Sequence, residues 1–381
     1  MKIGFVLDDH LHRPGGVQEY VRDLYRYLER QGHQAVIFCG GSQFENIFSE
    51  RVIQIGTALP VKGSGSSSSI PIAFQPPWEL RRLLRSENCD VLHVQAPFSP
   101  TLSGRLLAHS DAAHVLSFHI RIDDALRLRL LGALARLQIL SLRRIHARIA
   151  VSPAARETAE ALYAGGGYEI IGVGVDVAPF RAAQRLPRLP RYDDGRVTLM
   201  AVGRLEERKG LDRLLRAYAR LEREHGDALR LVIAGDGPER ERLRQLERDL
   251  GLRTVEWPGY VEREQLPHLM RSADVFCAPA LAQESFGKVL VEAMAAGLPI
   301  AAFANAGYAG VLGEHPGNLL APVGDERALA GAIGAFVASK AMRQQVGRRN
   351  HQAAEQYSWD ALGPRVLRVY EQAIERKRAG R

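Results

Sequence analysis

Short runs of apolar, largely β-branched residues alternate with amphipathic helical patterns along most of this 381-residue chain. Such alternation is typical of parallel sheets covered by helices. In residues 17–30, for example, Val21, Leu24 and Leu28 share one helical face, opposite a face of charged residues. In the first half, the pattern predicts strands at residues 3–7, 35–38, 91–94, 115–118 and 149–151.

The alternation breaks at residues 179–195, where Arg, Pro and Asp dominate and no apolar periodicity survives. We therefore expect a linker there, between a Rossmann-like domain at residues 1–178 and a second at residues 196–357. An amphipathic helix within residues 358–381 is expected to return to the first domain. The second domain should have strands at residues 197–202, 229–234, 255–257, 275–278 and 300–303.

The predicted fold class is α/β, with two doubly wound, Rossmann-like domains. If the two sheets face each other, the carboxyl ends of their strands line a central cleft, which is where open α/β folds bind ligands. Candidate chemistry is therefore sought at strand ends.

The composition is that of an ordinary globular protein, with 46% hydrophobic and 25% charged residues. The start of the chain lacks the pattern of a secretory signal, and no apolar run reaches the roughly 18 residues of a membrane span. We therefore expect a cytoplasmic protein. Its net charge of +8 suits phosphorylated substrates or anionic lipid, whereas no nucleic-acid-binding signature accompanies it.

The segment Glu284-Ser285-Phe286-Gly287 precedes a helical run that contains Glu292. Glu284 should lie in the loop and Glu292 inside the helix, so both could face a ligand at the helix start. Carboxylates there suit the hydroxyls of a sugar or ribose. The alternative, capping by Glu284 or Ser285 and a surface Glu292, does not explain an acid among apolar neighbours.

Two cations follow the strand at residues 197–202. Gly203-Arg204 ends that strand, and Lys209-Gly210 opens the next helix. Arg204 and Lys209 could bind a diphosphate and neutralise the charge that grows on a leaving group. The alternative is a solvated loop, since Glu206, Glu207 and Arg208 lie between them.

In the first half, Gly15-Gly16 and His119 each follow a predicted strand. Gly16 either allows close approach of a ligand or forms a tight turn with positive φ. His119 is either an active-site or a structural side chain. Asp8, Asp9, His10 and His12 crowd one loop without recognised metal-ligand spacing, so we predict no metal site.

Residues 126–149 are rich in arginine and leucine. Arg127, Arg129, Arg136 and Arg143 could contact an anionic membrane surface, which would place the protein peripherally on the inner face of the cell membrane. In the alternative, the leucine stripe packs on the protein's own sheet while the arginines meet water. That stripe consists of Leu126, Leu130, Leu134 and Leu137.

Taken together, the Gly-Gly-Val loop, Phe118-His119, the Arg204 and Lys209 pair and the segment ESFGKVLVEAMAAGLPI resemble retaining glycosyltransferase family 4, which has the GT-B fold. Within that family, the chain is most similar to phosphatidylinositol mannosyltransferases.

The resemblance implies transfer of a hexose from a GDP or UDP donor, without a metal or other cofactor. It implies that Arg204 and Lys209 bind the diphosphate, that Glu284 holds the sugar hydroxyls and Glu292 the ribose, and that His119 contacts the sugar. Donor contacts at Gly16 and along Ser285, Phe286 and Gly287 complete the implied site.

The acceptor implied is a membrane lipid such as phosphatidylinositol, with mannose from GDP-mannose as the donor sugar. Two alternatives remain open. One is the same chemistry on a soluble sugar or cyclitol. The other is a non-catalytic or NAD-type Rossmann protein whose basic helix binds a partner, although the chain lacks G-x-G-x-x-G.

Overall fold

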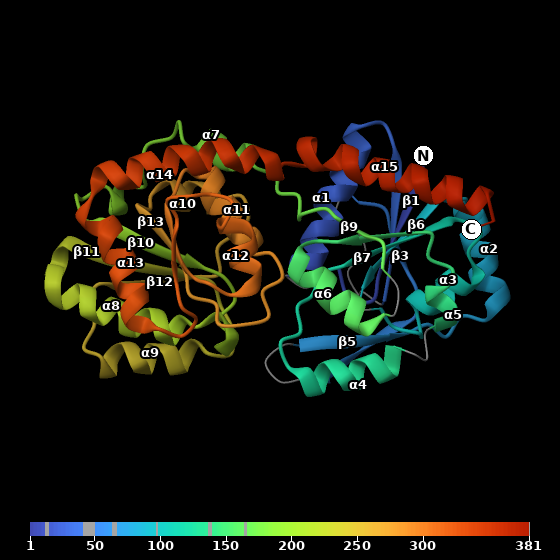
Figure 1. Ribbon diagram of the computed structural model, residues 1–381, viewed down its shortest axis with the longest axis horizontal. Helices are drawn as coiled ribbons and strands as arrows, with labels where there is room; N and C mark the ends of the chain where they lie inside the picture. The colour runs from blue at the N-terminus through green and yellow to red at the C-terminus, as the bar shows by residue number, and fades with distance from the viewer. Residues whose placement is uncertain are drawn as a thin grey trace. The chain divides into compact units, whose positions relative to one another are not determined.

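The computed structural model describes residues 1–11, 15–40, 50–62, 67–96, 98–135, 139–163 and 166–380. The chain divides into two compact units. Met1–Gly174 and Trp359–Arg381 form the first, and Val175–Ser358 form the second. Each unit contains one parallel sheet with helices around it, as the alternating pattern predicts (Figure 1).

The first unit is built on a seven-stranded parallel sheet in the order β3-β2-β1-β6-β7-β8-β9. Strands β6 and β7 are buried at every position, as expected for strands covered on both faces. The strands are β1 Lys2–Leu7, β2 Gln34–Cys39, β3 Val52–Gln54, β6 Val91–Ala96, β7 Ala113–Phe118, β8 Ala147–Ala150 and β9 Tyr168–Ile170, with a separate antiparallel pair, β4 Thr57–Lys62 and β5 Ser67–Ile72. The helices are α1 Gly16–Arg30, α2 Pro77–Glu87, α3 Ser103–His109, α4 Ala125–Ala135, α5 Ile139–Leu142, α6 Pro153–Leu162 and α15 Trp359–Arg378.

Helix α15 brings the end of the chain back to the first unit, where it packs on α1, β7 and β8 (Figure 1). Trp359 lies between two aromatic rings of α1, with ring centroids 5.4 Å from Tyr20 and 6.2 Å from Tyr27. Further along, the Tyr370 hydroxyl is 2.8 Å from His93 Nδ1 in β6. Aromatic packing and one buried hydrogen bond therefore fix this helix on the sheet.

The second unit is built on a six-stranded parallel sheet in the order β12-β11-β10-β13-β14-β15. Its strands are β10 Val197–Val202, β11 Leu229–Ala234, β12 Val255–Gly259, β13 Val275–Ala278, β14 Ile300–Phe303 and β15 Leu319–Ala321. Its helices are α7 Ala178–Ala183, α8 Leu211–His225, α9 Arg240–Asp249, α10 Leu266–Arg271, α11 Lys288–Ala295, α12 Ala306–Leu312, α13 Glu326–Ala338 and α14 Lys340–Ala353.

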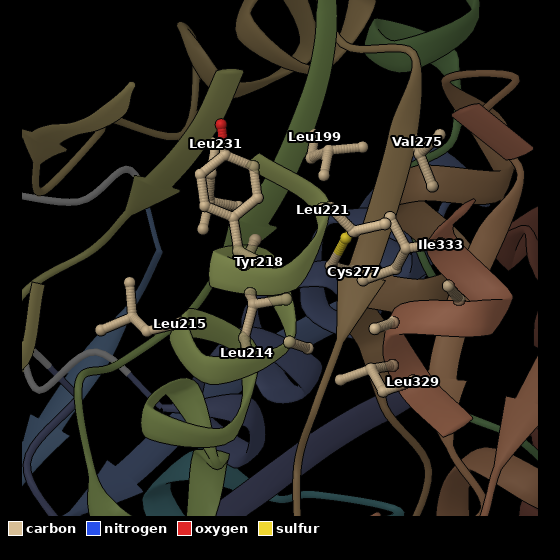
Figure 2. Packing of buried hydrophobic residues seen from close by; sticks show 14 of the residues in the cluster. Leu199, Leu214, Leu215, Tyr218, Leu221, Leu231, Val275, Cys277, Leu329 and Ile333 are labelled. Carbon is tan, nitrogen blue, oxygen red and sulfur yellow. The ribbon is translucent and has the colours of Figure 1, made fainter. Parts of the chain in front are cut away.

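The core of the second unit lies between the sheet and the neighbouring helices α8 and α13. Figure 2 shows Tyr218 of α8 beside Leu231 of the sheet, with Leu214 further along α8 and Ile333 of α13 across the cluster. All four side chains are at most 1% exposed. Burial of a leucine or isoleucine contributes roughly 1.5–3 kcal/mol, so this layer anchors the strands whose ends carry the site.

The linker expected at residues 179–195 is not a linker in the structure, because these residues lie inside the second unit. They include most of helix α7, and the buried ring of Tyr192 anchors them. Arg188 adds an ion pair to Asp274 at 3.0 Å. The chain passes between the units at Gly174–Val175 and again at Ser358–Trp359. The Arg- and Pro-rich composition resembles a linker, but its arginines and tyrosine bind the adjacent sheet.

Candidate active site

The carboxylate of Glu284 contacts two cations in the second unit. Its Oε1 atom lies 2.6 Å from Lys209 Nζ and 2.9 Å from Arg208 Nη1. Glu284 is only 9% exposed, so these charge-assisted hydrogen bonds form largely away from water, where they are strong. The fold thus brings together two predicted site residues, Glu284 and Lys209, from distant parts of the chain.

A second buried acid, Glu206, holds the neighbouring arginines. Its carboxylate lies 3.2 Å from Arg204 Nε and 2.8 Å from Arg208 Nε. Three cations and two carboxylates therefore form one connected cluster, which carries a net positive charge. Such a cluster suits an anionic ligand such as a diphosphate. The alternative of a solvated mixed-charge loop does not describe Glu206, which is 3% exposed, whereas the Arg204 side chain is 42% exposed.

Gly210 allows the loop that carries these cations to lie against the end of β13. Its φ is +63°, and a Cβ there would be 2.1 Å from the Pro279 carbonyl oxygen. The Leu281 amide donates to the Arg208 carbonyl at 2.8 Å, which ties the two segments together. This close backbone packing places the loop residue Lys209 within reach of Glu284.

Helix α11 begins directly after Gly287, whose φ is +89°. The N-cap residue Gly287 has no side chain with which to cap the helix, and the Glu284 carboxylate contacts Lys209 and Arg208, so the capping alternative for Glu284 is wrong. One turn into the helix, Glu292 Oε1 lies 3.7 Å from Lys288 Nζ, and its side chain is 13% exposed. Glu292 is therefore not the surface acid of that alternative. Phe286 is buried, with its ring edge-to-face against Tyr357.

A small cavity of about 20 Å³ lies at the carboxyl ends of β10 and β13. Gly203, Arg204 and Lys209 line one part of it, and Tyr308 of α12 lines another. Burial raises the pKa of Tyr308 well above its usual value, and the nearby Glu284 carboxylate acts in the same direction. The Tyr308 hydroxyl thus stays protonated beside the cluster.

In the first unit, His119 follows β7 and is buried. Its Nε2 is 2.7 Å from Gln95 Oε1, and its ring lies edge-on to Tyr20, with centroids 4.7 Å apart. Burial lowers the pKa of His119 to about 3, so the imidazole is neutral at physiological pH. With Nε2 as the donor to Gln95, Nδ1 is the acceptor nitrogen of this ring.

Gly15 and Gly16 stand at the start of α1 without the positive φ of a tight turn, so that alternative is wrong. A Cβ on Gly15 would lie 2.3 Å from Gln18 Oε1, which gives Gly15 a packing role. Among the described residues, a Cβ on Gly16 would meet no atom within 4 Å. The backbone of Gly16 therefore borders open space, as close approach of a ligand requires.

Models of two domain families match the two halves of the chain. Residues 14–178 match Glycosyltransferase Family 4, and residues 186–353 match Glycosyl transferases group 1. The phosphatidyl-myo-inositol mannosyltransferase of Mycobacterium leprae is 32% identical over 97% of this chain and 96% of its own length. This chain belongs to glycosyltransferase family 4. It is a hexosyltransferase, as the sequence resemblance implies.

The glycosyltransferase is also similar to a further enzyme and to solved structures. The alpha-monoglucosyldiacylglycerol synthase of Streptococcus pneumoniae is 24% identical over 98% of this chain and 86% of its own length. Anabaena HepE, solved in complex with UDP and glucose, has a TM-score of 0.75 at 18% identity and covers 97% of this chain and 99% of its own. These likenesses confirm the predicted GT-B fold class.

Two residues beside the predicted site residues were not singled out from the sequence. Arg208 was named only within the alternative of a solvated loop, yet it bridges Glu206 and Glu284. Gln95 was not singled out, yet it holds the His119 ring. The sequence did contain a signal for Gln95, because Gln95 lies near the end of β6 and His119 directly follows the neighbouring strand β7.

Helix α4 exposes part of its leucine stripe. Leu126 is 69% exposed and Leu130 is 60% exposed, alongside exposed Arg127 and Arg129. For these two leucines, packing on the protein's own sheet is therefore wrong. Arg143 beyond α5 is also exposed, whereas Arg136 and Leu137 lie outside the described residues.

Among the described residues, no helix is long and apolar enough to cross a membrane. Within the same ranges, no group of three or more His, Cys, Asp or Glu side chains is arranged to hold a metal ion. Asp8 instead accepts hydrogen bonds from Ser103, with its Oδ1 2.9 Å from the Ser103 hydroxyl. His12, from the predicted loop, is not among the described residues.

Proposed function

We propose that this glycosyltransferase transfers mannose from GDP-mannose to a phosphatidylinositol-type lipid, with retention of configuration and without a metal. The observation that carries the proposal is the cluster in which Arg208 and Lys209 meet Glu284, with Arg204 held beside them by Glu206. The mycobacterial relatives named for phosphatidyl-myo-inositol mannosyl transfer support the choice of donor sugar and acceptor.

In the proposed reaction, Arg204 and Lys209 bind the donor diphosphate. As the bond between the sugar anomeric carbon and the phosphate oxygen breaks, negative charge grows on the leaving GDP, and fixed cations stabilise it. These side chains supply the charge that a divalent metal supplies in other transferases. Lys209 Nζ lies 2.6 Å from Glu284 Oε1, which supports the proposal that the diphosphate and the sugar bind side by side.

Glu284 accepts hydrogen bonds from hydroxyls of the transferred mannose, and Glu292 accepts them from the ribose. Both acids are mostly buried, which suits strong hydrogen bonds to hydroxyl groups. The acceptor oxygen attacks the anomeric carbon from the face that the diphosphate leaves, and its proton passes to a donor phosphate oxygen. Retention follows from this same-face attack.

His119 and Gly16 serve the donor from the first unit in this proposal. The neutral His119 ring, fixed by Gln95, contacts the transferred sugar in this proposal. Gly16 leaves room for the donor beside the start of α1. Backbone amides there favour an anionic group.

The lipid acceptor requires contact with a membrane, and α4 has the side chains for it. Exposed Leu126 and Leu130 suit the acyl boundary of a bilayer, and Arg127 and Arg129 suit anionic headgroups. We therefore propose that the protein binds peripherally to the inner face of the cell membrane.

The test begins with thermal shifts of the purified protein in GDP, UDP and NAD. Stabilisation by GDP above UDP, with none from NAD, is expected. Transfer is then measured with radiolabelled GDP-mannose and either phosphatidylinositol vesicles or free inositol. Product that partitions into organic solvent supports the lipid acceptor. Product formed only on free inositol would contradict the lipid assignment and support a soluble acceptor.

A further inference from the structure

A cavity of about 640 Å³ lies in the first unit, lined largely by helices α4 and α6. Its volume falls within the range of pockets that bind small molecules. Residues after α5 and Arg148 of β8 complete the lining. None of these residues belongs to the cation and carboxylate cluster of the second unit or to the surroundings of His119.

The polar part of the lining is positively charged. Arg129, Arg143 and Arg148 line the cavity together with one acid, Glu160. Glu160 Oε1 is also 3.8 Å from Arg156 Nε on its own helix, so the negative charge of Glu160 already interacts with a cation that does not line the cavity. Across the described residues, no carboxylate forms an ion pair with Arg129 or Arg143 within 4.0 Å. The cavity therefore favours an anion.

The rest of the lining is apolar. Leu128, Leu142, Leu162 and the ring of Tyr163 contribute to it. Tyr163 is 4% exposed and its ring stacks on Phe98, so this wall is firmly packed. An inorganic anion would leave such a wall in contact with water, whereas an acyl chain would cover it.

Gly132 leaves space inside the cavity. In the described part of the chain, a Cβ at this position would have one neighbour within 4 Å, the Ala161 carbonyl oxygen at 3.8 Å, which is an ordinary contact. A larger side chain at Gly132 can therefore occupy the cavity without displacing the backbone. The helix that carries Gly132 also exposes Leu126 and Leu130, so the cavity adjoins the surface proposed to contact the membrane.

We propose that this cavity binds one anionic phospholipid from the membrane, with an acyl chain along the α4–α6 wall and the phosphate at Arg129, Arg143 and Arg148. The proposal rests on the proposed function only in taking a membrane as the source of the ligand. Arginines and an apolar wall in one cavity match the two chemical parts of such a lipid. Binding there would hold the enzyme on the bilayer that contains its acceptor.

The test uses dioctanoyl phosphatidylglycerol below its aggregation concentration, titrated into the full-length protein by calorimetry. We expect saturable binding of one lipid per chain. Dioctanoyl phosphatidylcholine, which lacks net charge, and glycerol phosphate, which lacks chains, should each bind at least tenfold more weakly. Equal affinity for glycerol phosphate would overturn the proposal, because the apolar wall would then contribute nothing. Equal affinity for the phosphatidylcholine would overturn the assigned role of the arginines.

Gly132→Trp should weaken binding of the monomeric lipid at least tenfold by filling the cavity. Ala161→Phe on α6 fills the same space from the opposite side and replaces Gly132→Trp if that variant does not fold. As the matched control, Leu126→Ser with Leu130→Ser changes the exposed face of α4 and should leave monomer binding unaltered. Wild-type affinity in a folded, cavity-filling variant would overturn the site.

The same preparations are assayed for mannosyl transfer, so that the two proposals can fail separately. Saturable lipid binding without any transfer from GDP-mannose would contradict the proposed function and leave the lipid site supported. Transfer to phosphatidylinositol without saturable binding of the monomeric lipid would overturn the lipid site alone.

Discussion

Glu284 is held by Lys209 and Arg208 before any donor enters the site. In the proposed reaction, a carboxylate fixed in this way loses little freedom when sugar hydroxyls bind to it. The backbone just before it is unusual, because Gln283 has a φ of +59°. That left-handed backbone conformation costs roughly 1–2 kcal/mol in a residue other than glycine, and it sets the direction of the backbone just before Glu284.

Glu284→Gln should lower kcat for mannosyl transfer by about 10²–10³-fold, the loss typical when one site group that stabilises the transition state is removed. The amide keeps the size of the side chain but removes the charge that orders Lys209 and Arg208. GDP affinity, measured by calorimetry, should change much less than kcat. Glu241→Gln, an exposed acid on α9, is the matched control and should retain full activity. Near-normal turnover of Glu284→Gln would contradict the assignment.

Gly16→Ala separates a ligand contact from a packing role. The new methyl group meets no atom of the described residues within 4 Å, and alanine is the better helix former, so the melting temperature should stay equal or rise. Donor affinity should nevertheless fall severalfold, because the methyl group enters the space proposed for the donor. Gly15→Ala differs in its cause, because the new Cβ would contact the Gln18 side chain of the protein itself and not the space proposed for the donor. Unchanged GDP-mannose affinity in Gly16→Ala would place the donor elsewhere.

At the scale of elements, helix α4 has an exposed face that is both apolar and basic. Arg127→Glu with Arg129→Glu should weaken binding to anionic vesicles more than tenfold, since each basic residue near such a surface contributes about 1 kcal/mol. The effect should shrink at high salt, as screening weakens the attraction. Co-sedimentation with vesicles of defined phosphatidylglycerol content measures it.

The matched control for α4 is Arg220→Glu with Arg327→Glu, which makes the same change of charge on exposed positions of the second unit. If both double variants lose binding equally, net charge rather than α4 drives the association. If neither loses binding, the proposed membrane contact of α4 is contradicted.

The sequence predicted the strands of the second unit closely, because parallel strands covered on both faces are continuous apolar runs. Strands β10, β11, β13 and β14 span the predicted residues. The strand β15 and the helix α14 were not predicted. The linker was wrong for a different reason, since the ion pair of Arg188 with Asp274 joins positions far apart in sequence. Composition does not reveal such pairing.

Residue types at strand ends predicted the candidate site, but they did not predict which side chains contact one another. Glu284 and Lys209 were predicted to face a ligand, and the fold brings them into contact. Arg208 could not be distinguished from its neighbours, because the direction of each side chain in the short turn Glu207–Lys209 depends on the packing of Gly210 against Pro279. That contact joins two loops from different strands.

At the scale of the whole molecule, the two units differ in their buried titratable groups. Burial lowers the pKa of His93, His114 and His119 in the first unit to about 3. Burial also raises the pKa of Asp8 to about 7, although hydrogen bonds from Ser99 and Ser103 oppose the shift. In the second unit, burial lowers the pKa of His315. The response to acid should therefore be dominated by the first unit.

The sign follows from the protons bound in each state. Between about pH 3 and 6.5, each unfolded histidine binds a proton that its buried counterpart refuses, so acid favours unfolding. Asp8 acts oppositely between about pH 3.8 and 7, because its folded form binds the proton more tightly. The three histidines together outweigh the single aspartate, so the free energy of unfolding decreases as the pH falls. The decrease is on the order of 1.4 kcal/mol per pH unit for each proton that the unfolded state binds in excess of the folded state.

We therefore expect the urea midpoint of the first unit to fall between pH 6.5 and 4.5, more than that of the second. Trp257→Phe leaves tryptophan only in the first unit, at Trp78 and the buried Trp359, so its fluorescence follows that unit alone. Comparison with the unmodified chain, which retains Trp257, gives the transition of the second unit. Adding His114→Gln to Trp257→Phe removes one buried histidine away from the donor site and should make the pH dependence shallower. A midpoint that stays constant or rises on acidification would contradict the assignment of these histidines as neutral in the folded protein.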